Sequence, residues 1–202
     1  ERYLNTQVPA GDAGAALIIQ LENNDAGLIE KEFEEIGKLS QKHGASEVYV
    51  ADTRTTKDRI WQARKAVPEA VSFFYSRYTK EDLVVPTALV PQLLEMIREK
   101  AEADGLEWIA YGHAGDGNMH CTIISPDCED WHERLHAVQE RIYAELIKMG
   151  GTLSGEHGIG FKRKGYMKFF LDEAQLELIK RVKLAFDPQN ILNPGKLVDW
   201  ER

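Results

Sequence analysis

The sequence is poor in cysteine and has neither a long hydrophobic run nor an excess of positive charge. Only 2 cysteines, Cys121 and Cys128, occur among 202 residues, so no disulfide framework is expected and a reducing compartment is the default. No apolar run approaches the roughly 18 residues that span a membrane, and no signal peptide is visible. We therefore expect a protein of the cytoplasm, or of the mitochondrial matrix in a eukaryote, without a transmembrane segment.

The charge balance argues against nucleic acid as a partner. The chain has 33 acidic and 25 basic residues and a formal net charge of -8, whereas nucleic-acid-binding surfaces show clustered lysine and arginine. A hydrophobic content of 43% is typical of an ordinary globular protein. The length allows one large domain or two small ones that share a core.

Strand-like and helix-like stretches alternate along the chain. Strands are predicted at 16–21, 47–51 and 82–85 and in a hairpin over 108–124, and helices at 25–43, 55–75, 91–104, 129–149 and 172–186. Asp172 is a plausible N-cap of the last helix. Half-polar strands mixed with helices indicate an α+β fold, an antiparallel sheet with helices on one side, followed by a C-terminal helical segment. The repeated βαβ order permits two duplicated ferredoxin-like halves.

The most informative segment is His113-Ala-Gly-Asp-Gly-Asn-Met-His120. Residues rich in β-formers flank it on both sides, and Asp116-Gly117 is the dipeptide preferred in a two-residue type I′ turn. With that turn His113 lies directly opposite His120, with the Cβ atoms about 5 Å apart. Two imidazoles held in this way make half of a zinc-type site.

A glycine-rich loop at 150–160 offers the remaining ligand. Gly155 and Gly158 flank the adjacent pair Glu156-His157, so the backbone can turn sharply and other groups can approach it closely. A catalytic zinc site needs three protein ligands and one open position. The alternative is a solvated turn that ends the preceding helix, but beside a preset histidine pair we favour a metal site.

A rival motif lies in the helix predicted at 129–149. His132-Glu133-Arg134-Leu135-His136 matches H-E-x-x-H, the zinc-protease signature. Its histidines lie beside the apolar stripe of the helix among charged neighbours, which indicates a wet flank rather than a buried cleft, and so short a pattern arises easily by chance. A stand-alone zinc metallohydrolase that uses His132, Glu133 and His136 therefore stays a minor alternative. A non-catalytic, metal-free ferredoxin-like interaction module is a third.

Two cations are candidates for binding an anion. Arg64 falls on the helical stripe of Ile60, Val67 and Val71, where an apolar residue is expected. A guanidinium that faces inward needs an anionic partner, and the alternatives are an internal salt bridge or a snorkelling side chain. Together with Lys80, which stands just before a strand, Arg64 could clamp a substrate carboxylate.

Four segments, in this order, resemble the C-terminal half of the FAD-linked 2-hydroxyacid dehydrogenases. That family includes the glycolate oxidase flavoprotein subunit, D-lactate dehydrogenase and D-2-hydroxyglutarate dehydrogenase. The segments are Trp61-Gln-Ala-Arg64-Lys, Gly112-His-Ala-Gly-Asp-Gly-Asn-Met-His120, Ser154-Gly-Glu-His-Gly-Ile-Gly160 and Phe186-Asp-Pro-Gln-Asn-Ile-Leu-Asn-Pro-Gly-Lys196. The second and third together are the most specific. The resemblance covers nearly the whole chain and implies that residues 1–202 form one substrate-binding or cap domain.

The resemblance also implies a role for each residue of the centre. His113, His120 and Glu156 would bind a divalent metal, with zinc as the first candidate. His157 would be the general base that takes the proton of the substrate hydroxyl. This division of work is physically sensible, because a Lewis acid lowers the pKa of a bound hydroxyl and a nearby imidazole can then remove its proton.

Further positions match family residues that contact the substrate or the flavin. Arg64 and Lys80 would hold the substrate carboxylate, and Asn193 lies in a returning segment that runs near the flavin in this family. Thr122 stands where the 2-hydroxyglutarate enzyme has asparagine, but it shares a strand face with His120 and could line the pocket. Pro68 replaces a threonine that contacts substrate in some members. These departures favour glycolate or D-lactate over 2-hydroxyglutarate, with glycolate slightly ahead.

In the family, an FAD-binding domain precedes this half, and nothing in the sequence supplies one. No G-x-G-x-x-G leads from a strand into a helix, and the chain begins at Glu1 rather than methionine. We therefore expect an excised domain that folds and binds metal but does not turn over substrate by itself. Its expected partners are a small 2-hydroxy acid and the FAD-binding domain of the same polypeptide, with other oxidase subunits or an electron acceptor as further candidates.

Overall fold

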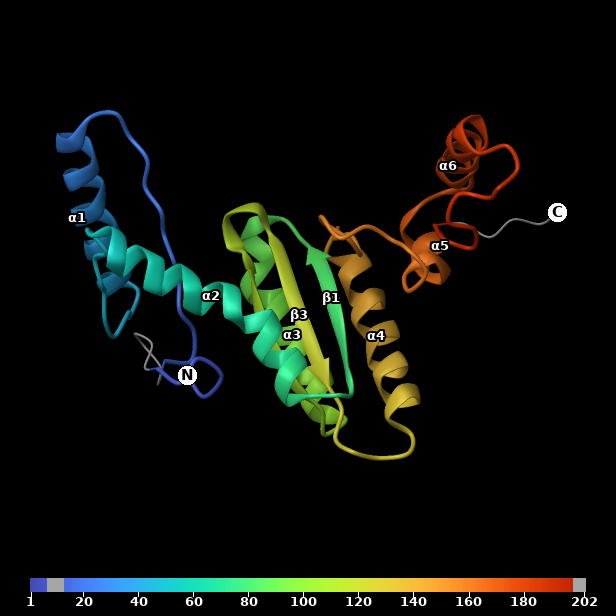
Figure 1. Ribbon diagram of the computed structural model, residues 1–202, viewed down its shortest axis with the longest axis horizontal. Helices are drawn as coiled ribbons and strands as arrows, with labels where there is room; N and C mark the ends of the chain where they lie inside the picture. Colours follow the sequence, from blue (N-terminus) through green and yellow to red (C-terminus); the bar gives the residue numbers. More distant parts are fainter. Residues whose placement is uncertain (7–12, 198–202) are drawn as a thin grey trace. The chain divides into compact units, whose positions relative to one another are not determined.

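The computed structural model describes residues 1–6 and 13–197, and the chain divides into two compact units, Glu1–Phe74 and Tyr75–Arg202. The first unit contains the helices α1 (Ala26–Lys42) and α2 (Arg54–Phe74) (Figure 1). The carboxylate of Asp25 caps α1 by accepting hydrogen bonds from the first backbone N–H groups of the helix. Both helices lie where the apolar periodicity predicts them.

The strands predicted in the first unit are wrong. Residues 16–21 and 47–51 carry no regular secondary structure, and apolar side chains such as Leu17 and Val50 are exposed. Their β-forming composition is correct for a strand, but a strand also needs a neighbour that completes its hydrogen bonds, and the one sheet among the described residues lies in the second unit. The duplication into two ferredoxin-like halves is therefore not seen in residues 1–6 and 13–197.

The second unit has the α+β architecture that the sequence predicts. Its sheet consists of β1 (Tyr78–Val84), β2 (Glu107–His113) and β3 (Asn118–Ile124) in the order β1-β3-β2, with antiparallel neighbours. Helix α3 (Val90–Ala103) connects β1 to β2, and α4 (Trp131–Lys148) follows β3. This order matches a ferredoxin-like half. An isolated antiparallel bridge from Val84 to Thr152 takes the place of the fourth strand, at the free edge of β1.

Helices α3 and α4 cover one face of the sheet, as expected. Alternate strand residues meet the helices in a single apolar core, in which each fully buried Leu or Ile contributes roughly 1.5–3 kcal/mol. The core includes Leu83, Cys121 and Ile123 of the sheet, Leu93 and Ile97 of α3, and Val138, Ile142 and Leu146 of α4. Because strand side chains alternate, the intervening residues form a second, largely polar face.

The C-terminal helical segment is also present. After α4 come the glycine-rich loop, the short α5 (Met167–Phe170) and α6 (Glu173–Phe186). Asp172 caps α6 in a capping box with Gln175, which confirms its predicted role. None of the helices in the described ranges has the length and apolar character needed to cross a membrane.

Candidate metal centre

The hairpin that carries the two histidines has a wider turn than predicted. His113 pairs with Asn118 and His120 pairs with Tyr111, so the two histidines are diagonal neighbours and not directly opposed. A 3₁₀ turn at Ala114–Asp116 and Gly117 at φ 73° form a four-residue loop. The chain after β1 favours this loop, because the N–H of Val85 donates to the carbonyl of Gly117 at 3.1 Å. The register shift is two residues, so both histidines still share the polar face.

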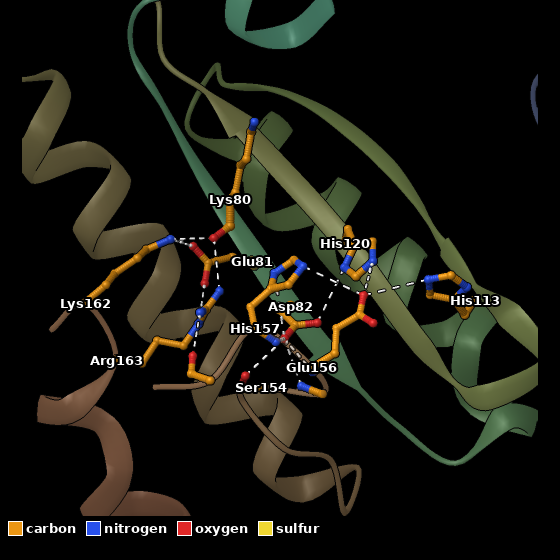
Figure 2. A network of polar contacts seen from close by, with 12 residues as sticks. Lys80, Glu81, Asp82, His113, His120, Ser154, Glu156, His157, Lys162 and Arg163 are labelled. Atoms are coloured by element: carbon orange, nitrogen blue, oxygen red, sulfur yellow. Dashed lines mark hydrogen bonds and ion pairs between the residues drawn. The ribbon is translucent and has the colours of Figure 1, made fainter. Parts of the chain in front are cut away.

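Three imidazoles converge on one carboxylate oxygen (Figure 2). Oε1 of Glu156 lies 2.9 Å from Nε2 of His120 and 3.7 Å from Nε2 of both His113 and His157. The ring of His157 stacks on that of His120 with centroids 4.8 Å apart, and His113 meets His120 edge-on at 5.5 Å. Ligand atoms of a tetrahedral site with bonds of about 2.1 Å lie about 3.4 Å apart. The three distances from Oε1 of Glu156 lie within about 0.5 Å of that spacing.

Asp82 is the central residue of the site, and the sequence analysis missed it. It is fully buried on β1, directly opposite His120. Its Oδ2 accepts hydrogen bonds from the Ser154 hydroxyl and from the backbone N–H groups of residues 155–157, at 2.8–3.0 Å. One carboxylate thus holds the whole turn that carries Glu156 and His157. The available signal was an acidic residue at the start of the strand predicted at 82–85.

The other oxygen of Asp82 faces His120. Oδ1 lies 3.4 Å from Nδ1 of His120, and neither of these buried atoms has a hydrogen-bond partner among the described residues. A carboxylate beside Nδ1 favours a proton on that nitrogen and leaves the lone pair of Nε2 directed at Glu156. Metal-bound histidines are held in this way by a carboxylate behind the ring. The residues present therefore fit a metal ion.

The electrostatics of the site favour the protonation states that metal binding requires. Burial by itself raises the pKa of Asp82, but hydrogen bonds from the backbone of His157 and Glu156 and from Ser154 outweigh it and lower the pKa to about 2. Burial, followed by the nearby His157, lowers the pKa of His120. At neutral pH the site thus holds an ionised carboxylate and a neutral imidazole.

Close packing explains one glycine of the loop. A Cβ atom on Gly155 would lie 2.6 Å from Nδ2 of Asn118 and 2.7 Å from Cγ2 of Val84. The absence of a side chain lets the loop lie against β1 and β3, as the glycine-rich pattern predicts.

The four remaining predicted residues belong to different elements of the fold. Thr122 shares its face of the sheet but is only 1% exposed, so its hydroxyl is enclosed. Lys80 is opposite Thr122, yet its ammonium lies 5.2 Å from the centroid of the Tyr78 ring and points away from the histidines in Figure 2. Arg64 belongs to α2 in the first unit, and Asn193 follows α6 at φ 52°. The roles of these four residues stay predictions.

The rival H-E-x-x-H motif is not assembled into a site. His132, Glu133 and His136 are exposed on α4, and the hydroxyl of Tyr166 lies 2.9 Å from Nε2 of His136. Within the described ranges, the one group of side chains that could hold a metal ion consists of Asp82, His120, Glu156 and His157, whose ligand atoms lie within 4.8 Å of one another. This group contains the predicted ligands His120 and Glu156 but not His113, whose Nε2 lies 3.7 Å from Oε1 of Glu156. The structure thus favours β3 and the glycine-rich loop over α4 as the metal site.

The chain is similar in sequence to several known oxidoreductases. The chain is 34% identical over 205 residues to a D-lactate dehydrogenase of Anaerostipes hadrus, which covers 98% of this chain and 43% of that protein. It is 37% identical over 172 residues to a D-lactate dehydrogenase of Archaeoglobus fulgidus, with 83% and 37% covered. It is 31% identical over 198 residues to the glycolate oxidase subunit GlcD of Bacillus subtilis, with 98% and 42% covered.

The chain thus spans 37 to 43% of the length of these relatives. A family model described as FAD linked oxidases, C-terminal domain, matches residues 1–197. The resemblance found in the four sequence segments is therefore confirmed, and the chain belongs to the family of C-terminal domains of FAD linked oxidases.

Proposed function

We propose that this chain is the substrate-binding domain of an FAD-dependent oxidoreductase that converts a small 2-hydroxy acid, of the glycolate or D-lactate type, into the 2-oxo acid. The observation that carries this proposal is the convergence of His113, His120 and Glu156 on the polar face of the sheet, in a chain of the FAD linked oxidase family. The names of the relatives, D-lactate dehydrogenase and glycolate oxidase subunit, support a hydroxy acid as substrate.

His113, His120 and Glu156 would hold a divalent ion. Two imidazole nitrogens and one carboxylate oxygen form a donor set that suits Zn²⁺, and three protein ligands leave a position for the substrate hydroxyl. When bound, such an ion supplies a Lewis acid that lowers the pKa of an alcohol oxygen placed on it.

His157 is the proposed general base. Its Nδ1 lies 3.8 Å from Oδ2 of Asp82, and its Nε2 lies on the side of Glu156. Half of the side chain is exposed, so a substrate hydroxyl at the metal centre can reach the ring. A positioned imidazole that takes this proton contributes typically 10²–10⁴-fold to the rate.

The rest of the reaction needs groups that bind the acid and accept electrons. Arg64 and Lys80 are proposed to hold the substrate carboxylate, Thr122 to line the pocket and Asn193 to lie near the flavin. FAD, held mainly by an FAD-binding domain of the same polypeptide, supplies the acceptor for the hydride from C2 of the substrate. We propose that the present chain by itself binds metal and does not turn over substrate. We also propose that the whole protein works in the cytoplasm, or in the mitochondrial matrix of a eukaryote.

Metal analysis of single variants tests the centre. His113→Ala and His120→Ala are expected to lose stoichiometric zinc after dialysis against a zinc buffer, while His132→Ala and His136→Ala, the matched controls on α4, keep it. Loss of zinc confined to the two α4 variants would overturn the proposal in favour of the metallohydrolase motif.

The general base is tested in the full-length flavoprotein. His157→Ala is expected to abolish flavin reduction by glycolate and by D-lactate, followed as flavin bleaching in stopped flow, while metal content stays near that of the unmodified protein. Unchanged reduction rates would remove His157 from this role.

A further inference from the structure

A buried carboxylate lies directly behind the metal centre and is not used by the proposed function. Glu81 precedes Asp82 in β1, so the two side chains point to opposite faces of the sheet. Glu81 is 1% exposed, and its carboxylate accepts hydrogen bonds from the hydroxyl of Thr79 at 2.7 Å, from the amide of Gln139 at 2.8 Å and from the hydroxyl of Tyr143. These donors are neutral, and a carboxylate removed from water also needs a charged partner.

Two neighbouring cations supply that charge (Figure 2). Nζ of Lys162 lies 2.6 Å from Oε1 of Glu81 and donates to the backbone carbonyl of Lys80 at 2.5 Å. The guanidinium of Arg163 donates to that same carbonyl at 3.2 Å and to the carbonyl of Gly158 at 3.1 Å. Its Nε lies 3.9 Å from Oε2 of Glu81.

These contacts hold the segment 154–158 at its second end. Asp82 binds residues 154–157 from the polar face of the sheet. Arg163 binds its end at the carbonyl of Gly158. Lys162 and Arg163, which follow the segment, are in turn bound to Lys80 and Glu81 of β1. Three consecutive residues of β1 therefore hold the loop on both faces.

The loop needs such restraint because its functional side chains are poorly packed. The side chain of Glu156 is 50% exposed and that of His157 is 52% exposed, so contacts with the core do not fix their positions. A metal site works only when its ligands are held in place by the contacts behind them.

We propose that Glu81, Lys162 and Arg163 form a clamp that positions Glu156 and His157 at the metal centre. The three are positioning residues and touch neither substrate nor metal. The assignment to a metal centre rests on the proposed function, whereas the positioning of the loop is a property of the chain itself.

Titration with Co²⁺ tests the clamp on the purified chain. Lys162→Met keeps the length of the side chain and removes its charge, and we expect it to weaken Co²⁺ binding by about tenfold or more and to change the visible absorption of the bound ion. Lys162→Arg, which can still donate to both Glu81 and the Lys80 carbonyl, is expected to restore affinity and spectrum. Lys168→Met, on the exposed side of α5, is the matched control and should behave as the unmodified chain does.

Amide hydrogen exchange by NMR tests the same clamp without metal. In Lys162→Met the amides of residues 155–157 are expected to lose about tenfold in protection, while that of Ile123 in β3 keeps its value, because a local release of the loop leaves the sheet intact. Equal loss at Ile123 would show general destabilisation and overturn a positioning role. Unchanged protection together with unchanged Co²⁺ affinity would also overturn it. If the unmodified chain binds no Co²⁺, the proposed metal centre fails, and the exchange data alone decide the clamp.

Discussion

Replacing Asp82 by asparagine measures how much the negative charge of Asp82 contributes to the free energy of unfolding. The substitution keeps a carbonyl oxygen that can accept hydrogen bonds from the loop, but it removes the negative charge that strengthens them. Hydrogen bonds to charged groups contribute about 1 kcal/mol more than neutral ones. Four donors meet Oδ2 of Asp82, so about 4 kcal/mol is an upper bound.

The pKa of Asp82 gives a second value for the contribution of its charge to the free energy of unfolding. A decrease from 3.8 to about 2 corresponds to about 2.4 kcal/mol in favour of the ionised form in the folded protein. This energy is lower than the upper bound of about 4 kcal/mol. The difference agrees with a partly exposed loop, whose N–H groups can bind water in place of the carboxylate. We therefore expect Asp82→Asn to lower the free energy of unfolding at pH 7 by about 2–3 kcal/mol.

The sign of the pH dependence follows from the direction of the shift. Because the folded-state pKa lies below the unfolded-state value, the stabilisation is complete well above pH 3.8 and is lost as the pH falls toward 2. Urea unfolding, followed by tryptophan fluorescence at pH 7, 4 and 3, should show the difference between the two proteins becoming smaller. Asp130→Asn is the control, because that exposed carboxylate makes no capping hydrogen bond. A difference below about 0.5 kcal/mol at pH 7, or one that stays constant with pH, would refute the reasoning.

Three further results are expected. Gly117→Ala should lower the free energy of unfolding by about 2 kcal/mol or more in urea titrations. The reason is that Gly117 has φ 73° and that an added Cβ would collide with the carbonyl of Val85. An alanine variant of normal stability would contradict the turn geometry. Ile142→Ala should lower the free energy of unfolding by about 2–5 kcal/mol, because it leaves a cavity in the core. Calorimetric titration should give an unchanged Zn²⁺ dissociation constant for the folded protein. A parallel loss of Zn²⁺ affinity would contradict the separation of core and site. Zn²⁺ at 100 times its dissociation constant should stabilise the chain by about 2.7 kcal/mol in thermal unfolding, and EDTA should reverse this, whereas the same stabilisation in His120→Ala would place the metal elsewhere.

Local sequence signals predict much of the second unit. Apolar periodicity locates α3 and α4 to within about two residues, and Asp172 marks the start of α6. The two histidines share a face in any hairpin whose register differs from the predicted one by an even number of residues. For that reason the prediction that the two histidines share a face is correct although the predicted turn is wrong.

Long-range contacts account for what the sequence does not predict. The turn after His113 depends on Val85, which lies about thirty positions earlier in the chain and donates to Gly117. The role of Asp82 depends on the backbone of residues 155–157, more than seventy positions later. The segment at 47–51 has the composition of a strand, but composition does not specify a partner for its hydrogen bonds.

Because Glu81 and Asp82 point to opposite faces, they also specify the register in which β1 pairs with β3. A slip of β1 by one residue would turn Asp82 into the apolar layer and Glu81 toward the histidines, and both carboxylates would lose their partners at once. Misaligned pairings of β1 with β3 are thus disfavoured on both faces of the sheet. Since only the correct alignment assembles the ligands, a metal ion would bind the correctly folded sheet selectively and add its binding free energy to that state alone.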